Sequence, residues 1–140
     1  MDIDVDLRLK GKVVTRCYLD GAFGLEFWEK GSRTVIRITR IMRIEQGGLE
    51  LELSAEKTTE AAQASILLRK TIAHAVGLKD GTLDVSFSDG TRLIVPVDPD
   101  YEAWEVSGDD GFLVVSRPGG GLAVWGPREV SSAYPRKGKV

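Results

Sequence analysis

The side chains that most often carry catalysis or bind metal ions are sparse and far apart in this chain. The only histidine, His74, has no second histidine or cysteine at metal-site spacing, and no serine lies in a recognisable nucleophile turn. The single cysteine, Cys17, rules out an internal disulfide. Carboxylates alternate at Asp2, Asp4 and Asp6, but ligands on one strand face do not converge on a metal ion. The sequence therefore predicts no catalytic residue, no cofactor and no metal site, and we expect a protein that is not an enzyme.

Aromatic and acidic side chains gather instead between residues 98 and 110. The rings of Tyr101 and Trp104 can bury apolar area while their OH or NH group reaches a polar partner, and nearby carboxylates would attract a basic partner. Alternation along a strand over 101–106 would send the two rings to opposite faces, so we expect one ring in the core and leave open which one. Packing of both rings within the sheet is the alternative. The candidate partner-binding residues are Asp98, Asp100, Tyr101, Glu102, Trp104 and Glu105.

Arginine recurs at every third position in the segment RTVIRITRIMRIE, at Arg37, Arg40 and Arg43. The β-branched residues at its start favour a strand, and a bulge near Thr39 followed by a second short strand would absorb the period of three. A helix over 37–44 is the other option. The three arginines are either a solvated face opposite nearby acids or a contact site for an anion or an acidic partner.

The composition is that of an ordinary globular domain and limits the partners and the location. The 140 residues are 42% hydrophobic and 29% charged, which is enough for one domain with a core. The net charge of −2 argues against a nucleic-acid partner, because such binding requires an excess of basic residues. No apolar run reaches the roughly 18 residues of a membrane span, and the opening MDIDVDLRLK has no signal-peptide core. We therefore expect a cytoplasmic protein without membrane contact, in keeping with the lone cysteine.

Short segments rich in β-forming residues, divided by glycine turns, make up most of the chain. Residues 2–10 alternate between aliphatic and charged, which predicts a strand with one buried face. Similar patterns along the chain predict a mainly β (α+β) fold, with antiparallel β-meanders forming a sandwich or an open barrel-like sheet. One helix is expected at about 58–72, capped by Thr58 or Thr59. Its apolar stripe would consist of Ala61, Ala64, Ser65, Leu68 and Ile72.

Two segments on either side of this helix are similar to each other. In residues 12–38 and again in 73–97, an Asp-Gly turn leads into a strand with alternating apolar residues, followed by a second glycine turn and another strand. We expect an internal duplication within a single β-rich domain over 1–126, with chance similarity between meanders as the alternative. Residues 127–140 form a basic tail that is expected to be flexible or to dock on an acidic partner. The basic side chains of this tail are Arg128, Arg136, Lys137 and Lys139.

Three stretches, taken in order, resemble one protein family. They are GKVVTRCYLDGAFGLEF, DGTLDVSFSDGTRLIVPVDPDYEAWEV and VVSRPGGGLAVW, and their most specific pieces are YEAWE at 101–105 and PGGGLAVW at 118–125. On these residues the chain, from about Gly11 to Gly126, resembles DUF6188, a bacterial and largely actinobacterial family of unknown function. The resemblance implies a single mainly β domain. It implies no activity and no catalytic residues.

These observations favour a non-enzymatic protein-binding module that engages a basic partner through its acidic and aromatic segment. A regulatory protein, or an immunity protein that masks a toxin, would fit this size and charge. Two alternatives remain open. Open sheet edges and the repeated meander would suit a structural domain that forms homodimers. A cavity inside the β shell would suit a small-molecule-binding domain or an enzyme without a recognisable motif.

Overall fold

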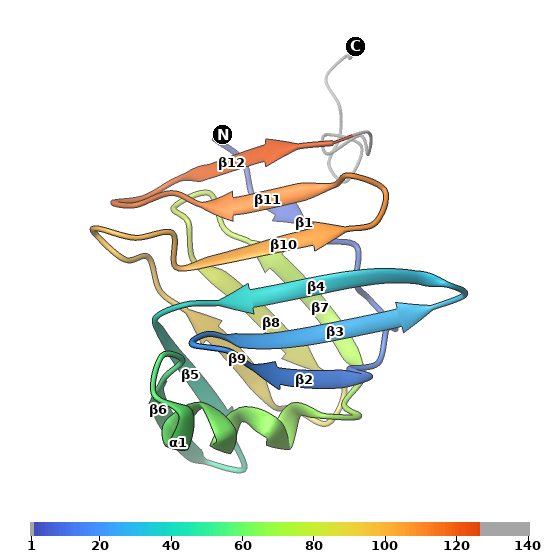
Figure 1. Ribbon diagram of the computed structural model, residues 1–140, viewed down its shortest axis with the longest axis vertical. Helices are drawn as coiled ribbons and strands as arrows, with labels where there is room; N and C mark the ends of the chain where they lie inside the picture. Colours follow the sequence, from blue (N-terminus) through green and yellow to red (C-terminus); the bar gives the residue numbers. More distant parts are fainter. Residues whose placement is uncertain (1, 127–140) are drawn as a thin grey trace.

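Segments with alternating apolar residues form strands throughout the part of the chain that the structure describes. The computed structural model describes residues 2–126 of the 140, and the predicted basic tail at 127–140 lies outside them. The described residues form two six-stranded antiparallel sheets that pack against each other without closing into a barrel (Figure 1). The prediction of a mainly β fold is confirmed, and the sandwich is the architecture found.

Neighbouring strands in each sheet are not always neighbours in sequence. The first sheet has the order β1 (Val5–Asp6), β7 (Ile72–Gly77), β8 (Leu83–Phe87), β9 (Arg92–Val95), β5 (Ile41–Gln46), β6 (Leu49–Ser54). The second sheet has the order β12 (Leu122–Trp125), β11 (Leu113–Ser116), β10 (Trp104–Gly108), β4 (Ser32–Ile38), β3 (Phe23–Glu29), β2 (Arg16–Leu19). Between β6 and β7 lie a helical turn, α1 (Thr58–Ala61), and a 3₁₀ segment, η1 (Ala62–Leu67).

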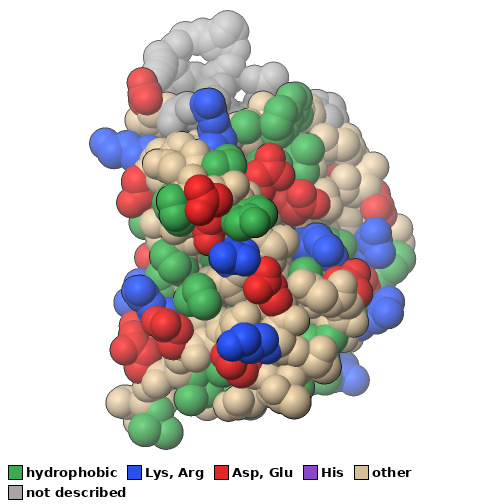
Figure 2. Space-filling model, turned by 60° about the vertical axis from the view of Figure 1, so that its left-hand side comes forward, with side chains coloured by type: hydrophobic (Ala, Val, Ile, Leu, Met, Phe, Trp, Pro, Cys, Tyr) green, Lys and Arg blue, Asp and Glu red, His purple; other side chains and the backbone are tan. Residues whose placement is uncertain are grey.

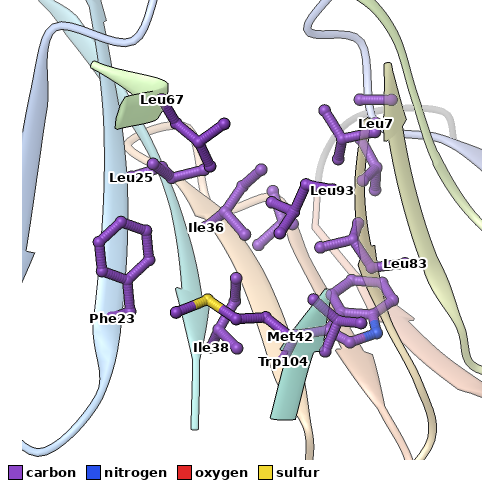
Figure 3. Packing of buried hydrophobic residues seen from close by; sticks show 14 of the residues in the cluster. Leu7, Phe23, Leu25, Ile36, Ile38, Met42, Leu67, Leu83, Leu93 and Trp104 are labelled. Atoms are coloured by element: carbon purple, nitrogen blue, oxygen red, sulfur yellow. The ribbon is translucent and has the colours of Figure 1, made fainter. Parts of the chain in front are cut away.

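Apolar side chains from both sheets meet between them and form one core. Alternation along β3 and β4 turns Phe23, Leu25 and Ile36 inward, while Met42 and Leu93 approach from the first sheet (Figure 3). All five side chains are fully buried. Burial of each such side chain contributes roughly 1.5–3 kcal/mol to folding, so the two sheets are held together as one unit.

Each half of the chain builds a three-stranded meander in one sheet and then sends its remaining strands to the other sheet. Strands β2 to β4 form a meander in the second sheet, after which β5 and β6 cross over and β5 pairs with β9. Strands β7 to β9 form a meander in the first sheet, after which β10, β11 and β12 cross back as a second meander and β10 pairs with β4. The two halves are therefore interlocked. The predicted duplication over 12–38 and 73–97 falls on these two meanders and stays a prediction.

The two crossing connections, from β4 to β5 and from β9 to β10, touch each other. Thr39 donates its backbone N–H to the carbonyl oxygen of Ala103 at 3.0 Å, and its hydroxyl to the carbonyl oxygen of Glu102 at 2.7 Å. The expected bulge near Thr39 is wrong, because the chain changes sheet there, and the alternative helix over 37–44 is wrong as well. Strands β4 and β5 each alternate with a period of two, and the two residues between them, 39 and 40, interrupt that alternation. Arg37 on β4, Arg40 in the connection and Arg43 on β5 are therefore three residues apart without forming one continuous element.

The helix expected over 58–72 is wrong in its length and its cap. Its N-cap is Lys57 rather than either predicted threonine, and no side chain caps it. The backbone N–H of Arg69 instead bonds the carbonyl oxygen of Val14 at 2.9 Å, which draws the chain out of the helix. Ile72 therefore begins β7 and does not complete an apolar helix stripe. The short helical segment lies at one end of the sandwich (Figure 1).

The N-terminal segment keeps the predicted alternation but not the predicted length of strand. Val5, Leu7 and Leu9 are fully buried, as the pattern over residues 2–10 indicates. Only two residues of this segment form the regular strand β1, and Arg8 adopts a left-handed conformation with φ of 61°. That conformation interrupts the extended chain, so beyond β1 the segment is held beside β7 by hydrophobic burial together with single backbone hydrogen bonds, such as that from the N–H of Leu7 to the carbonyl oxygen of Ala75 at 3.0 Å.

Candidate protein-binding surface

The connection from β9 to β10 contains an ordered turn around Asp98. One carboxylate oxygen of Asp98 accepts hydrogen bonds from the backbone N–H groups of Asp100, at 2.9 Å, and Tyr101, at 3.0 Å. The bond from Asp100 is the main reason that the pKa of the Asp98 carboxyl lies below its usual value, and the guanidinium of Arg40 adds to this effect. The side chain of Asp98 therefore fixes the backbone that carries Tyr101.

Tyr101 is the exposed ring and Trp104 is the buried one. The strand expected over 101–106 is wrong at its start, because β10 begins only at Trp104 and the alternation does not reach back to Tyr101. The side chain of Tyr101 is 55% exposed, whereas that of Trp104 is 1% exposed. Nε1 of Trp104 donates to the carbonyl oxygen of Gly81 at 2.8 Å, and the ring lies in the core (Figure 3). Trp104 is therefore a core residue and is not available to a partner.

Arg40 joins the two crossing connections through its side chain. Its Nε lies 3.2 Å from Oδ2 of Asp98, and its Nη1 lies 2.7 Å from Oε2 of Glu56. The guanidinium carbon lies 4.6 Å from the centre of the Tyr101 ring, which is within the range of a cation–π contact. The bonds to Glu56 and Asp98 raise the pKa of Arg40. The Tyr101 ring is thus supported on one face by a fixed positive charge.

We call the surface around these residues the crossing patch. It contains an open depression of about 480 Å³ whose polar and aromatic lining consists of Thr39, Arg40, Glu56, Asp100, Tyr101 and Glu102. With Asp98 included, the patch contains four carboxylates and one guanidinium, which gives a formal net charge of −3. The patch lies on the side where the chain passes between the sheets (Figure 1), and Figure 2 shows acidic, basic and apolar side chains intermixed on that side.

The other residues predicted to bind a partner lie elsewhere. Glu105 lies beside Arg37 on the outer face of the second sheet, where Nη1 of Arg37 is 3.0 Å from Oδ1 of Asp20. Arg43 lies on the first sheet, with its Nε 3.4 Å from Oε1 of Glu52. The three arginines of the central segment therefore lie on three different surfaces, each beside a carboxylate, and form no common basic site.

Two residues of the crossing patch, Thr39 and Glu56, are not predicted by the sequence. Glu56 is one of many surface acids, and only the passage of β5 into the first sheet brings it to Arg40. The available signal is the break in alternation at Thr39, which marks the point where the chain leaves one sheet. A break of this kind identifies a crossing but not the residues that will meet there.

A second depression, of about 440 Å³, lies on the outer face of the second sheet, and its charges are balanced. Glu26 in this depression is only 3% exposed. Its Oε1 accepts a hydrogen bond from Nε1 of Trp28 at 3.0 Å, and its carboxylate oxygens lie 3.5 Å from Arg33 and 3.7 Å from Arg16. The charged residues lining the depression are Arg16, Arg33 and Arg37 with Asp20, Glu26 and Glu105. Their charges cancel, so this surface has no net charge to attract an ionic partner.

The two side chains with the most catalytic potential, His74 and Cys17, lie on different sheets. His74 is exposed on β7. Burial raises the pKa of the Cys17 thiol to about 11, so it stays protonated at neutral pH and is a weak nucleophile. Within residues 2–126, no three His, Cys, Asp or Glu side chains are placed to hold a metal ion. The helical segments of this part of the chain are too short and too polar to cross a membrane.

The fold and the crossing patch define a class of protein: an antiparallel β-sandwich in which the two halves exchange strands and leave an acidic surface at the exchange point. The chain belongs to the family of unknown function DUF6188, whose model matches residues 5–126. The match confirms the resemblance seen in the sequence and spans nearly all of the described residues. Comparison with the curated proteins and with the solved structures gave no match. Any function must therefore be argued from the surface itself.

Proposed function

We propose that this protein is a binding module that recognises a basic partner protein through the crossing patch. The observation that carries the proposal is Tyr101, whose ring is 55% exposed yet held by the Asp98 turn and by Arg40. A ring that is already fixed loses little conformational entropy when a partner packs on it. The net negative charge around the ring favours the approach of a basic surface.

A lysine or arginine side chain of the partner would suit the crossing patch. Asp98 and Glu56 are already paired with Arg40, whereas Asp100 and Glu102 are exposed and form no ion pair within residues 2–126. These two carboxylates are free to bind an incoming cation. The apolar stem of the same side chain can pack against the face of Tyr101 that Arg40 leaves open.

Affinity capture with the tagged protein, from a lysate of its source at low and at high salt, tests this function. We expect a stoichiometric partner with a basic surface at low salt and its loss at high salt, because exposed charge pairs are screened. Tyr101→Ala and Glu102→Lys should each abolish capture. Mass spectrometry identifies the partner, and circular dichroism confirms that each variant is folded.

Glu105→Lys is the matched control, because it makes the same change of charge three residues away on a different face. Capture should survive this substitution. If Tyr101→Ala and Glu102→Lys retain the partner, or if Glu105→Lys loses it to the same degree as Glu102→Lys, the crossing patch is not the binding site. Recovery of the protein alone, with no partner, would favour the homodimer alternative.

A further inference from the structure

Strand β6 is an open edge of the first sheet and the longest of the four sheet edges. It has six residues, whereas β1 has two and β2 and β12 have four each. Only β5 pairs with it in the part of the chain that the structure describes. A strand edge of this length presents unpaired backbone groups to which another strand can bind.

The backbone groups that face away from β5 belong to Glu50 and Glu52. The two-residue turn Gly47-Gly48 joins β5 to β6, so the residues that flank it, Gln46 and Leu49, exchange backbone hydrogen bonds. Residues of β6 then alternate: Leu49 and every second residue after it bond to β5, and those between them point their N–H and C=O groups outward. Ser54 is two residues beyond Glu52, so its N–H should also point away from β5. The structure confirms this orientation, because the N–H of Ser54 donates to a carboxylate oxygen of Glu60 at 2.8 Å and not to β5. No hydrogen bond occupies the outward groups of Glu50 and Glu52 within residues 2–126.

The two faces of β6 carry different types of side chain, apolar on one face and acidic on the other. Leu49 and Leu51 share a face with the buried Leu53, but they extend beyond the core and are 73% and 36% exposed. Glu50 and Glu52 lie on the opposite face of the strand. Glu52 shares an exposed ion pair with Arg43 at 3.4 Å, and Glu50 forms no ion pair within residues 2–126. The edge therefore offers an apolar row on one side and an acidic row on the other.

This edge leads directly into the crossing patch. After β6 ends, the backbone N–H of Ala55 bonds the carbonyl oxygen of Arg40 at 2.7 Å, and the next residue, Glu56, pairs with the guanidinium of Arg40. Acidic side chains thus continue from the strand edge to the surroundings of Tyr101.

We propose that β6 is the docking edge for an extended segment of the basic partner, which adds to the first sheet as a seventh strand. This proposal rests on the proposed function for the charge of the partner and adds how the partner binds. The segment alternates apolar and basic residues, so that apolar side chains pack beside Leu49 and Leu51 while basic side chains face Glu50 and Glu52. The outward N–H and C=O groups of the two glutamates supply its backbone hydrogen bonds.

Charge complementarity argues that the occupant is a basic segment rather than a second copy of β6. If two copies paired antiparallel about Leu51, Glu50 of each copy would lie opposite Glu52 of the other. Like charges directly opposite each other destabilise a strand pair. A lysine or arginine at those positions turns the same arrangement into an attraction.

Short capped peptides that alternate valine and lysine test the proposal by NMR on the full chain. We expect binding to slow the amide hydrogen exchange of Glu50 and Glu52 by about tenfold or more at saturation, because each amide gains a hydrogen bond. A peptide that alternates valine and glutamate is the control for charge. A valine–lysine peptide with alternate backbone amides methylated is the control for strand pairing, and neither control should protect the two amides.

The variant Glu50→Lys/Glu52→Lys should reverse the preference, binding the valine–glutamate peptide and losing the valine–lysine one. Absence of protection by the valine–lysine peptide, or equal protection by the methylated peptide, would overturn the strand-addition proposal. In the capture experiment, a partner that is lost with Glu102→Lys but kept by Glu50→Lys/Glu52→Lys would overturn the docking edge alone. A partner kept by both would overturn the docking edge and the proposed function together.

Discussion

The two connections between the sheets make the same kind of crossing with different lengths of chain. The connection from β4 to β5 consists of two residues, 39 and 40, and both are used to hold the crossing together. The connection from β9 to β10 consists of eight residues, 96–103, and it forms a capped turn with Tyr101 exposed. The short connection therefore has a structural role, whereas the longer one also contains residues that are exposed and do not hold the crossing together. We place binding on the longer connection for this reason.

The largest expected difference in unfolding free energy is between substitutions of Trp104 and Tyr101, the two aromatic residues near the end of the longer connection. Trp104→Ala should destabilise the protein by about 3–5 kcal/mol, because it removes a fully buried ring and leaves a cavity. Tyr101→Ala should cost less than about 1 kcal/mol, because the ring is mostly exposed. Chemical denaturation of both variants measures the difference. Similar losses for the two substitutions would mean that Tyr101 is a structural residue.

The contact between the two connections should have a smaller effect on stability. Thr39→Val removes the hydroxyl that donates to the carbonyl oxygen of Glu102 and should cost about 1 kcal/mol. Thr39→Ser keeps a hydroxyl and should lose clearly less. Urea denaturation of the two variants gives the comparison. Equal destabilisation by both would show that the methyl group, rather than the hydrogen bond, holds the crossing.

The pH dependence of stability should report the charge on the longer connection. The pKa of Asp98 is lowered in the folded protein, so its contribution to stability is complete above the unfolded pKa of about 3.9 and is lost as the pH falls through the folded pKa. Asp98→Asn keeps an acceptor for the turn but does not titrate. Its unfolding free energy should therefore fall less steeply than that of the parent protein below about pH 4.

Asp89, outside the crossing, provides the comparison for this titration. Hydrogen bonds from Lys70 and then from Thr91 lower the pKa of Asp89 to about 2. Asp89→Asn should also flatten the acid limb of the stability curve. If the unfolding free energy of Asp98→Asn falls with pH as steeply as that of the parent protein, while that of Asp89→Asn falls less steeply, the titration of Asp98 makes no contribution to stability.

The smallest effect on global stability is expected for substitutions of Arg40, which should change the hydrogen exchange of nearby amides instead. Arg40→Ala removes one exposed ion pair, to Glu56, one half-buried ion pair, to Asp98, and the support of the Tyr101 ring. The amides of Asp100 and Tyr101 should then exchange hydrogen faster, while the midpoint of unfolding changes little. Arg40→Lys keeps the charge but not the planar fork, so it should restore only part of the protection. Unchanged exchange in Arg40→Ala would mean that Asp98 alone orders the turn.

Alternation predicts the buried faces of this fold well but does not predict which strands pair. Phe23, Leu25 and the other inward residues follow from a period of two, because each strand has one face against the core. The exchange of strands between the two sheets does not follow from any local pattern. It places Trp104 opposite Ile38, a pairing of residues far apart in sequence that depends on the packing of the whole sandwich.

The candidate surface is predicted in part. Sequence alone identifies Asp98, Asp100, Tyr101 and Glu102 as a group, because they are adjacent in the chain. It assigns residue 101 to a strand, since the competing hydrogen bond from its backbone to the Asp98 side chain is not visible in a pattern of apolar residues. Glu105 is adjacent in sequence but lies on another face, because β10 has begun by then and alternation applies again.

The interlocked halves make the protein suitable for fragment complementation. If the backbone is cut between β6 and β7, one piece keeps β4 without β10, and the other keeps β9 without β5. Each piece then exposes an apolar sheet face and a central strand that lacks a partner along one edge, so neither should fold alone. Mixed together, the two pieces should form the complete sandwich, and the reassembled protein would remain joined by the strands that the halves exchange, without a covalent link between them.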